Sequence, residues 1–84
     1  MTRAELIADF ASWIADITDR PAPELRDETD LVDDLELDSL ALAELAAMVR
    51  KKYKIKLRPG ELQDRLKVGL LVDMVLERLA SAKP

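Results

Sequence analysis

The stretch DSLALAELAAMVRKKY, residues 38–53, has the pattern of an amphipathic helix and decides the fold of the chain. Asp38 or Ser39 suits the cap of its first turn, because a short side chain with an oxygen atom can accept a hydrogen bond from a free backbone amide there. Alanines between the larger apolar residues allow close packing against other helices. We expect a helix that begins at this cap and ends near Tyr53. Its larger apolar residues recur three or four positions apart, at Leu42, Leu45, Met48 and Val49.

The composition indicates one small domain, residues 1–84, with a helical core. Hydrophobic residues make up 49% and charged residues 36% of the chain, which is typical of a folded domain rather than a disordered one. Aromatic residues are only 4%, and the many leucines and alanines favour helices. The chain has no cysteine, which excludes a disulfide and a zinc site built on thiolates. The net charge of −4 disfavours non-specific binding to nucleic acid.

A first helix is expected over about residues 3–18. Thr2 and Glu5 have the spacing of a capping box, in which each side chain accepts a hydrogen bond from the backbone amide of the other residue. Pro21 ends this helix and opens a long loop, whose part over residues 24–38 is rich in carboxylates. Leucines are interleaved with these carboxylates, so we expect the loop to be pinned to the core.

Two further helices complete the expected fold. Pro59 suits the first position of a short third helix over about residues 59–65. A last helix is expected over about residues 68–80, where apolar residues again recur at helical spacing. The sequence therefore predicts an all-α fold. It is a four-helix bundle with three longer helices and one short helix, and with a long loop between the first and second helices.

Ser39 lies at a helix start but lacks the partners that would make it an enzyme's nucleophile. The chain has no histidine, which excludes a Ser-His-Asp arrangement. The acidic loop does not match a calcium-binding EF-hand, since Leu35 follows Asp30 where that loop needs glycine. A helical chain of this size also offers little concave surface for a sugar between two carboxylates. We expect a protein that is not an enzyme and whose serine another enzyme modifies.

Residues 31–57, LVDDLELDSLALAELAAMVRKKYKIKL, resemble the core of an acyl carrier protein. In that family an Asp-Ser-Leu sequence opens the second helix, and Asp38-Ser39-Leu40 matches it. The resemblance implies that Ser39 carries 4′-phosphopantetheine, transferred from coenzyme A by a phosphopantetheinyl transferase. The thiol of that arm holds an acyl group as a thioester, so the chain itself needs no cysteine. A phosphodiester here also meets free backbone amides and the positive end of the helix dipole.

The resemblance further implies a partner surface and a cleft for the acyl chain. Leu40 matches an exposed leucine that partners bind in the family, and the alternative is a partly buried helix residue. The acidic residues either attract cationic partners or form only a solvated loop. The residues expected to bind partners are Asp34, Asp38, Leu40, Glu44, Arg50, Lys51 and Lys52. The residues that either line the acyl-chain cleft or belong to the ordinary core are Met48, Val49, Leu57, Leu62 and Leu71.

The chain departs from the family pattern at several places, two of which concern the approach to Ser39 and the end of the second helix. Glu36-Leu37 stand where a glycine or asparagine is typical, which is expected to stiffen the loop before Ser39. Six cations lie between Arg50 and Arg58 with no anion, whereas fatty-acid carriers tend to be acidic at the end of the second helix. Cations at a helix C-terminus complement the dipole, which explains part of this cluster. The cluster also favours a polyketide or mixed polyketide–peptide pathway over housekeeping fatty-acid synthesis.

The expected protein is a stand-alone, monomeric carrier that works in the cytoplasm with the transferase, an acyltransferase or synthase, and tailoring enzymes. Its first residues are too polar for a signal peptide, and no apolar run is long enough to span a bilayer, so a membrane is not an expected partner. Nucleic acid is not an expected partner either, because the net charge is negative. Two alternatives remain open. One is a peptidyl or aminoacyl carrier, although Glu36-Leu37-Asp38 is not the glycine-glycine-histidine lead common there. The other is an unmodified helical adaptor that binds through the acidic loop and Leu40.

Overall fold

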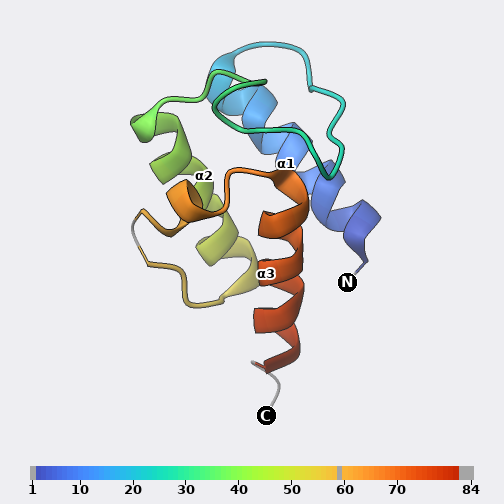
Figure 1. Ribbon diagram of the computed structural model, residues 1–84. Coiled ribbons are helices and arrows are strands. Elements are labelled where there is room, and N and C mark those ends of the chain that lie inside the picture. Colours follow the sequence, from blue (N-terminus) through green and yellow to red (C-terminus); the bar gives the residue numbers. More distant parts are fainter. Residues whose placement is uncertain (1, 59, 82–84) are drawn as a thin grey trace.

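Residues 2–58 and 60–81 are described by the computed structural model, and helices are the regular elements in this part of the chain (Figure 1). Their order is α1 (Arg3–Thr18), α2 (Ser39–Tyr53), the short 3₁₀ helix η1 (Glu61–Asp64) and α3 (Val68–Ser81). The described residues form no β-strand, only an isolated antiparallel bridge between Asp30 and Lys67. The predicted all-α fold is confirmed.

The short third helix differs from its prediction over residues 59–65. It has four residues and is a 3₁₀ helix, since the amide of Arg65 bonds to the carbonyl of Leu62, three residues back, at 3.0 Å. Gly60 precedes it with a φ of 79°, a left-handed conformation that glycine adopts without steric cost. Pro59, which was expected to begin this helix, lies outside the described residues. The described chain thus has three α-helices and one short 3₁₀ helix.

Side-chain caps set the starts of α1 and α2. The Thr2 hydroxyl accepts from the Glu5 amide at 3.2 Å, and the Thr2 amide donates to the Glu5 carboxylate at 3.0 Å, so the predicted capping box is confirmed. At α2 the cap is Asp38 rather than Ser39. Its Oδ1 accepts from the amide of Ala41 at 2.8 Å, and Ser39 is the first helical residue.

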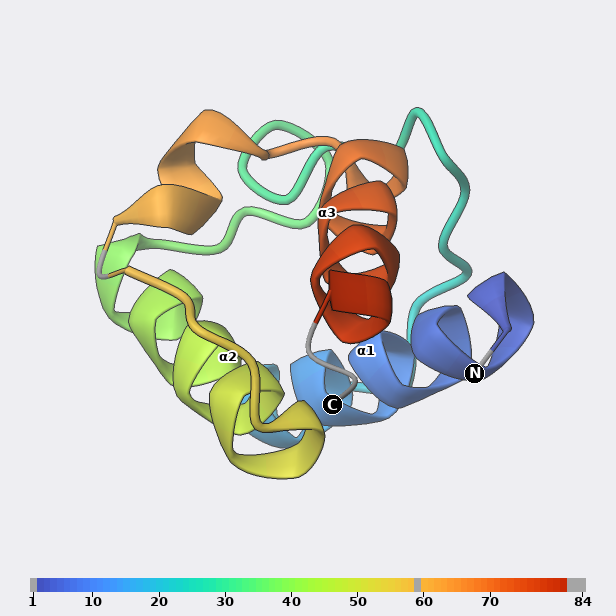
Figure 2. The ribbon, with the colours of Figure 1, turned by 90° about the horizontal axis from the view of Figure 1, so that it is seen from below.

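The core lies between the three α-helices, and the long loop also contributes to it. Seen from below, α1, α2 and α3 surround this interior, while η1 lies beside α2 and α3 (Figure 2). Each fully buried leucine or valine stabilises the fold by roughly 1.5–3 kcal/mol. The most deeply buried helical side chains are those of Leu6, Phe10, Leu45, Val49, Leu62, Val68, Leu71, Val72 and Val75.

The loop between α1 and α2 is attached to the start of α3 at several points. The side chains of Leu31 and Leu37 are buried in the core, as expected for a pinned loop. The Leu31 amide donates to the carbonyl of Leu66 at 2.8 Å, and the Gly69 amide donates to the carbonyl of Asp27 at 2.9 Å. A Cβ atom on Gly69 would lie 2.9 Å from the Asp27 Cβ, so only glycine allows this approach. The loop therefore has a defined path to Ser39.

An ion pair between the buried Glu61 and the half-buried Arg78 attaches η1 to α3. The Glu61 side chain is only 8% exposed, and its Oε2 accepts from Arg78 Nη1 at 2.9 Å and from the Arg58 amide at 3.0 Å. Arg78 Nη2 also contacts Glu61 Oε1, so the pair is bidentate. These hydrogen bonds, first those from Arg78 and then that from Arg58, lower the pKa of Glu61 to about 2. The charged form of Glu61 is therefore the form that stabilises the fold.

We expect Glu61→Gln to lower the free energy of unfolding at neutral pH by roughly 1.5–3 kcal/mol, the range for a hydrogen bond to a charged group. Because the pKa of Glu61 is lower in the folded chain than its ordinary value of 4.5, its stabilisation is complete above pH 4.5 and is lost as the pH falls toward about 2. Urea unfolding at several pH values should show the wild type and the variant converging over that interval. Asp64→Asn, which changes an exposed carboxylate of the same short helix, is the control. A constant gap between wild type and Glu61→Gln down to pH 2 would contradict this assignment.

Candidate functional site

Ser39 presents its hydroxyl to solvent at the first turn of α2. The residue is exposed, and none of the described residues forms a hydrogen bond with its side chain. The Asp38 cap uses the amide of Ala41, which leaves other first-turn amides near Ser39 without an intrahelical partner. With no histidine in the chain, no imidazole can act as a base for this hydroxyl. The Ser39 hydroxyl is thus accessible at the start of α2.

A groove of about 160 Å³ runs beside Ser39 between α2 and η1. Leu42, Ala43, Ala46 and Arg50 line it from α2, and Leu62 and Gln63 line it from η1. The α2 residues follow Ser39 at intervals of three, four, seven and eleven, which places them on the same helix face. Helical spacing counted from Ser39 is therefore the signal that identifies Leu42, Ala43 and Ala46, which were not among the predicted site residues.

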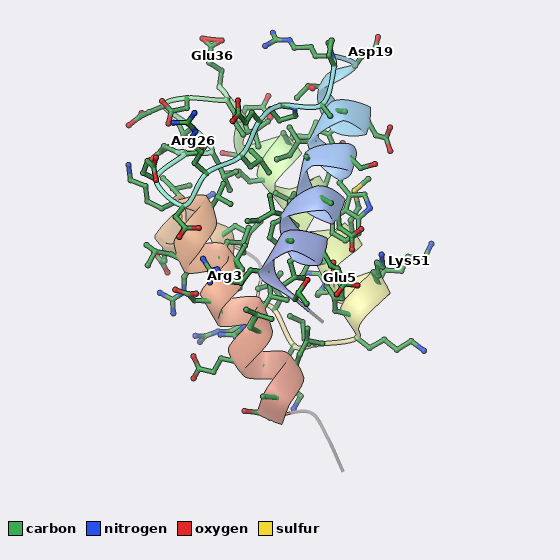
Figure 3. The ribbon with its side chains drawn as sticks, turned by 90° about the vertical axis from the view of Figure 1, so that its right-hand side faces the viewer. Arg3, Glu5, Asp19, Arg26, Glu36 and Lys51 are labelled. Carbon is green, nitrogen blue, oxygen red and sulfur yellow. The ribbon has the colours of Figure 1, made fainter. Side chains whose placement is uncertain are left out.

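Glu36 lies in the loop three residues before Ser39 and has an unusual backbone conformation. Its φ is 58°, in the left-handed region where glycine and asparagine are favoured. The side chain extends from the loop at the top of the molecule, away from the helices (Figure 3). A residue with a Cβ costs roughly 1–2 kcal/mol in this conformation. Glu36 thus adopts the backbone conformation that the family's glycine or asparagine suits, even though the residue type differs.

Three of the predicted partner-binding residues lie around one open hollow near Ser39. Asp38, Leu40 and Glu44 line this hollow of about 260 Å³, which lies between the end of α1 and the start of α2. The side chain of Leu40 is 68% exposed, so the alternative of a partly buried residue is wrong. Asp34 is exposed but does not line this hollow, and its Oδ2 accepts from the Asp30 amide at 2.7 Å.

The three predicted cations at the end of α2 differ in their surroundings. Arg50 Nη1 donates to the carbonyl of Leu57 at 3.2 Å, which ties the end of α2 to the segment that follows it. Lys52 Nζ donates to Asp9 Oδ2 at 2.8 Å. Lys51 is exposed, and no ion pair or side-chain hydrogen bond joins it to the described residues. Its side chain extends from the helix end into solvent (Figure 3).

Lys52 belongs to a small cluster that joins α2 to α1. Its ammonium lies 5.9 Å from the ring centroid of Trp13 and 5.8 Å from that of Tyr53, within the range of cation–π attraction. The Tyr53 hydroxyl also donates to Asp9. Hydrogen bonds from Lys52 and Tyr53 lower the pKa of Asp9, and burial together with Asp9 raises the pKa of Tyr53. Lys52 therefore has a structural role in joining α2 to α1.

The five predicted cleft residues do not lie around a single hollow of the described chain. Val49, Leu57 and Leu71 are buried in the core, and Met48 is half-buried. Leu62 is also buried, but it lines the groove beside Ser39. The assignment of these residues to an acyl-chain cleft stays a prediction.

The described residues contain no group of three or more histidine, cysteine, aspartate or glutamate side chains arranged to hold a metal ion. Within residues 2–58 and 60–81, none of the helices combines the length and the apolarity that crossing a bilayer requires.

The surroundings of Ser39 fit an attached phosphodiester. Its hydroxyl is accessible, and the first-turn amides and the positive end of the α2 dipole can face an anion joined to it. The Asp38 carboxylate, the nearest acid in sequence, is engaged by the Ala41 amide. The adjoining groove offers both apolar walls and the polar side chain of Gln63.

Comparison with known proteins gives the same assignment for most of the chain. Residues 8–75 match the sequence model of the family described as "Phosphopantetheine attachment site". The meromycolate extension acyl carrier protein of Mycobacterium leprae is 32% identical over 84 residues, which are 100% of this chain and 72% of that protein. An acyl carrier protein of Rhodococcus erythropolis is 31% identical over 71 residues, 84% of this chain and 78% of that protein. One of Acidothermus cellulolyticus is 24% identical over 82 residues, 98% of each chain.

Since the family match spans residues 8–75 and relatives align along the whole chain, the chain belongs to the acyl carrier protein family, whose members are carriers and not enzymes and hold a covalently attached 4′-phosphopantetheine.

Proposed function

We propose that Ser39 is the attachment point of 4′-phosphopantetheine and that the protein presents acyl thioesters to partner enzymes. The observation that carries this proposal is the exposed Ser39 hydroxyl at the capped start of α2, within the residues that match the family. The arm, when attached, supplies a thiol that holds the acyl group as a thioester. The chain's own contribution is to display Ser39 and to face the phosphodiester with first-turn amides.

The groove between α2 and η1 gives the attached arm a place to lie against the protein. Leu42 and Leu62 offer apolar contact there, while Gln63 carries both a donor and an acceptor. Its volume of about 160 Å³ accommodates part of an arm or a short acyl group without unpacking the core. Val49 and Leu71 lie inside the core, so a longer chain reaches them only if the helices move apart.

The pathway is proposed to be one that extends an acyl chain in the cytoplasm, with a polyketide or related specialised product as the predicted outcome. Several relatives are named for meromycolate extension, which supports chain extension as the general task. We also propose that the chain acts as one monomeric domain. A peptidyl or aminoacyl carrier is the second candidate, and it differs in the group that the thiol accepts.

Incubation with coenzyme A, magnesium and a broad-specificity phosphopantetheinyl transferase should add one phosphopantetheine to the wild type and none to Ser39→Ala, as measured by intact mass. Ser12→Ala, which removes another exposed hydroxyl, should be modified like the wild type. Ser39→Ala should remain folded, because Asp38 and not Ser39 caps α2. If the wild type gains no mass while a known carrier in the same tube does, the unmodified adaptor becomes the better interpretation.

We propose that the transferase and the synthases bind the hollow around Leu40, together with Asp38 and Glu44. An exposed leucine beside the attachment serine can enter an apolar pocket of a partner, while the carboxylates face its cations. Asp34 is proposed to act at longer range through its charge. These acidic residues increase the rate of encounter more than the affinity, and salt screens them over about 8–10 Å.

Leu40→Ala should lower kcat/KM for modification of Ser39 by about tenfold, the usual effect of truncating a buried anchor of an interface. Leu70→Ala is the matched control, because Leu70 is 50% exposed on α3 and does not line that hollow. The measurement is the kcat/KM of the transferase with the wild type and with each variant at one salt concentration. Equal kcat/KM values for the two variants would remove Leu40 from the partner surface.

We also propose that the cations at the end of α2, Arg50, Lys51 and Lys52, help to select the partner enzyme. Arg50 and Lys52 have intramolecular contacts as well, so reversing their charges also disturbs the fold. Lys51 has no such contact with the described residues and isolates the effect on partners.

We expect Lys51→Glu to change the ratio of the acyl-transfer rates to two different synthases by about threefold or more. The new carboxylate repels the two synthases to different extents, because their surfaces carry different charges. Its unfolding midpoint should stay close to that of the wild type, with a loss of roughly 0.3–1 kcal/mol from the helix dipole. Lys52→Glu, which places a carboxylate beside Asp9, should lose more stability than Lys51→Glu. An unchanged transfer ratio for Lys51→Glu would leave dipole complementation as its role.

A further inference from the structure

The segment after α2 separates its cations from its apolar residues by strict alternation. Ile55 and Leu57 are buried, with exposures of 6% and 5%, whereas Lys54, Lys56 and Arg58 are exposed. In an extended chain, alternate side chains point to opposite sides. Lys54 itself has a left-handed backbone conformation as the C-cap of α2, and after it the buried Ile55 and Leu57 alternate with the exposed Lys56 and Arg58. We call the three exposed cations, Lys54, Lys56 and Arg58, the basic strip.

An open hollow of about 570 Å³ adjoins the basic strip and the C-terminal part of α3. Its lining consists of the basic strip together with Ile55, Glu61, Arg78 and Ser81. Glu61 and Arg78 form an ion pair whose charges offset each other, so the three cations of the strip remain in excess. No ion pair among the described residues involves Lys54, Lys56 or Arg58. The hollow consequently has an excess of positive charge.

The basic strip lies at the opposite end of α2 from Ser39. In Figure 1 the acidic loop is at the top and the start of α2 at the upper left, whereas the segment that follows α2 (yellow) lies at the lower left. The 15 residues of α2 separate the two ends by about 22 Å. This exceeds the Debye length at physiological salt, so the positive end is not cancelled by the acidic loop. A partner on the basic strip leaves Ser39 accessible.

We propose that the basic strip is a docking site for an acidic, extended segment of a partner protein. In the alternating part of the segment Lys56 and Arg58 stand two residues apart, which suits carboxylates at alternate positions of an extended peptide, and Lys54 adds to the positive charge. The adjoining hollow provides space for the peptide beside the strip. The role of such a site is to hold a partner at one end of the carrier while a second enzyme works on Ser39 at the other.

An anionic membrane is a poorer match for the same charges. The apolar side chains of the segment, Ile55 and Leu57, are buried, so none of them is available to enter a bilayer.

The test uses a fluorescein-labelled, blocked peptide that alternates glutamate and threonine, with fluorescence anisotropy as the readout on the unmodified protein. The wild type should bind it more tightly than a peptide with glutamine in place of glutamate. The double variant Lys56→Gln/Arg58→Gln should weaken binding by about tenfold, since each exposed charge pair contributes a few-fold. The control is Arg20→Gln/Arg26→Gln, which removes the same number of charges from exposed residues near the acidic loop. It should bind like the wild type.

Three results would overturn the proposal. The first is no preference of the wild type for the acidic peptide. The second is equal weakening in both double variants, which would show an effect of net charge alone. The third is a strip that binds vesicles of phosphatidylcholine and phosphatidylserine but not the peptide, which would assign it to membranes. Phosphopantetheine attachment to Ser39, measured separately by mass, should be normal in the Lys56→Gln/Arg58→Gln variant. Failure of the wild type to bind the peptide would therefore contradict the docking site alone, whereas failure of attachment would contradict the proposed function.

Discussion

The hydrogen bond from the Ala41 amide to the Asp38 carboxylate determines where α2 begins, and the geometry of the site depends on it. Because Asp38 stays outside the helix, Ser39 becomes its first residue and stands in solvent. The same helix carries Leu42, Leu45 and Val49 into the core at helical spacing. The residue at which α2 begins therefore determines both that Ser39 is exposed and that the apolar face of the helix is buried. The cap also satisfies an amide without using the Ser39 hydroxyl, which leaves that hydroxyl available.

The long loop is ordered because it packs and bonds at a few specific positions. Leu31 and Leu37 enter the core, and backbone hydrogen bonds join the loop to the start of α3. Asp30 holds its own turn together, since its carboxylate accepts from the amides of Asp33 and Val32, and these bonds lower its pKa. The carboxylates of Asp30 and Asp34 therefore stabilise the loop through hydrogen bonds, in addition to any attraction of partners. These contacts hold Asp38 and Ser39 in a defined position relative to the core.

The two ends of α2 carry opposite charge, and this arrangement fits a carrier that meets several enzymes. The end with Ser39 offers Leu40 and carboxylates, while the other end offers Lys51 and the basic strip. Charges of this kind orient an approaching partner more than they strengthen its final complex. Glu61 lines the positive hollow, where its carboxylate is paired with Arg78.

The sequence by itself determined the helices and their caps, since both depend on residues close together in the chain. The period of the apolar residues predicted α1, α2 and α3 within a residue or so, and Thr2 with Glu5 predicted the first cap. Asp38-Ser39-Leu40 pointed to the family, which the comparisons show. The short third helix was placed less well, because a 3₁₀ helix of four residues has too few positions to show a period.

Only the tertiary structure decided which charged side chains are free and which are engaged. Arg50, Lys51 and Lys52 look equivalent in the sequence, yet Lys52 meets Asp9 from α1 and Arg50 meets a carbonyl beyond the end of its helix. The groove beside Ser39 likewise needs η1, which follows α2 by several residues and returns to pack against it. These contacts join segments whose separation along the chain carries no periodic signal. They exist because the apolar faces of the helices can be buried together in only a few arrangements, and that packing sets which polar groups meet.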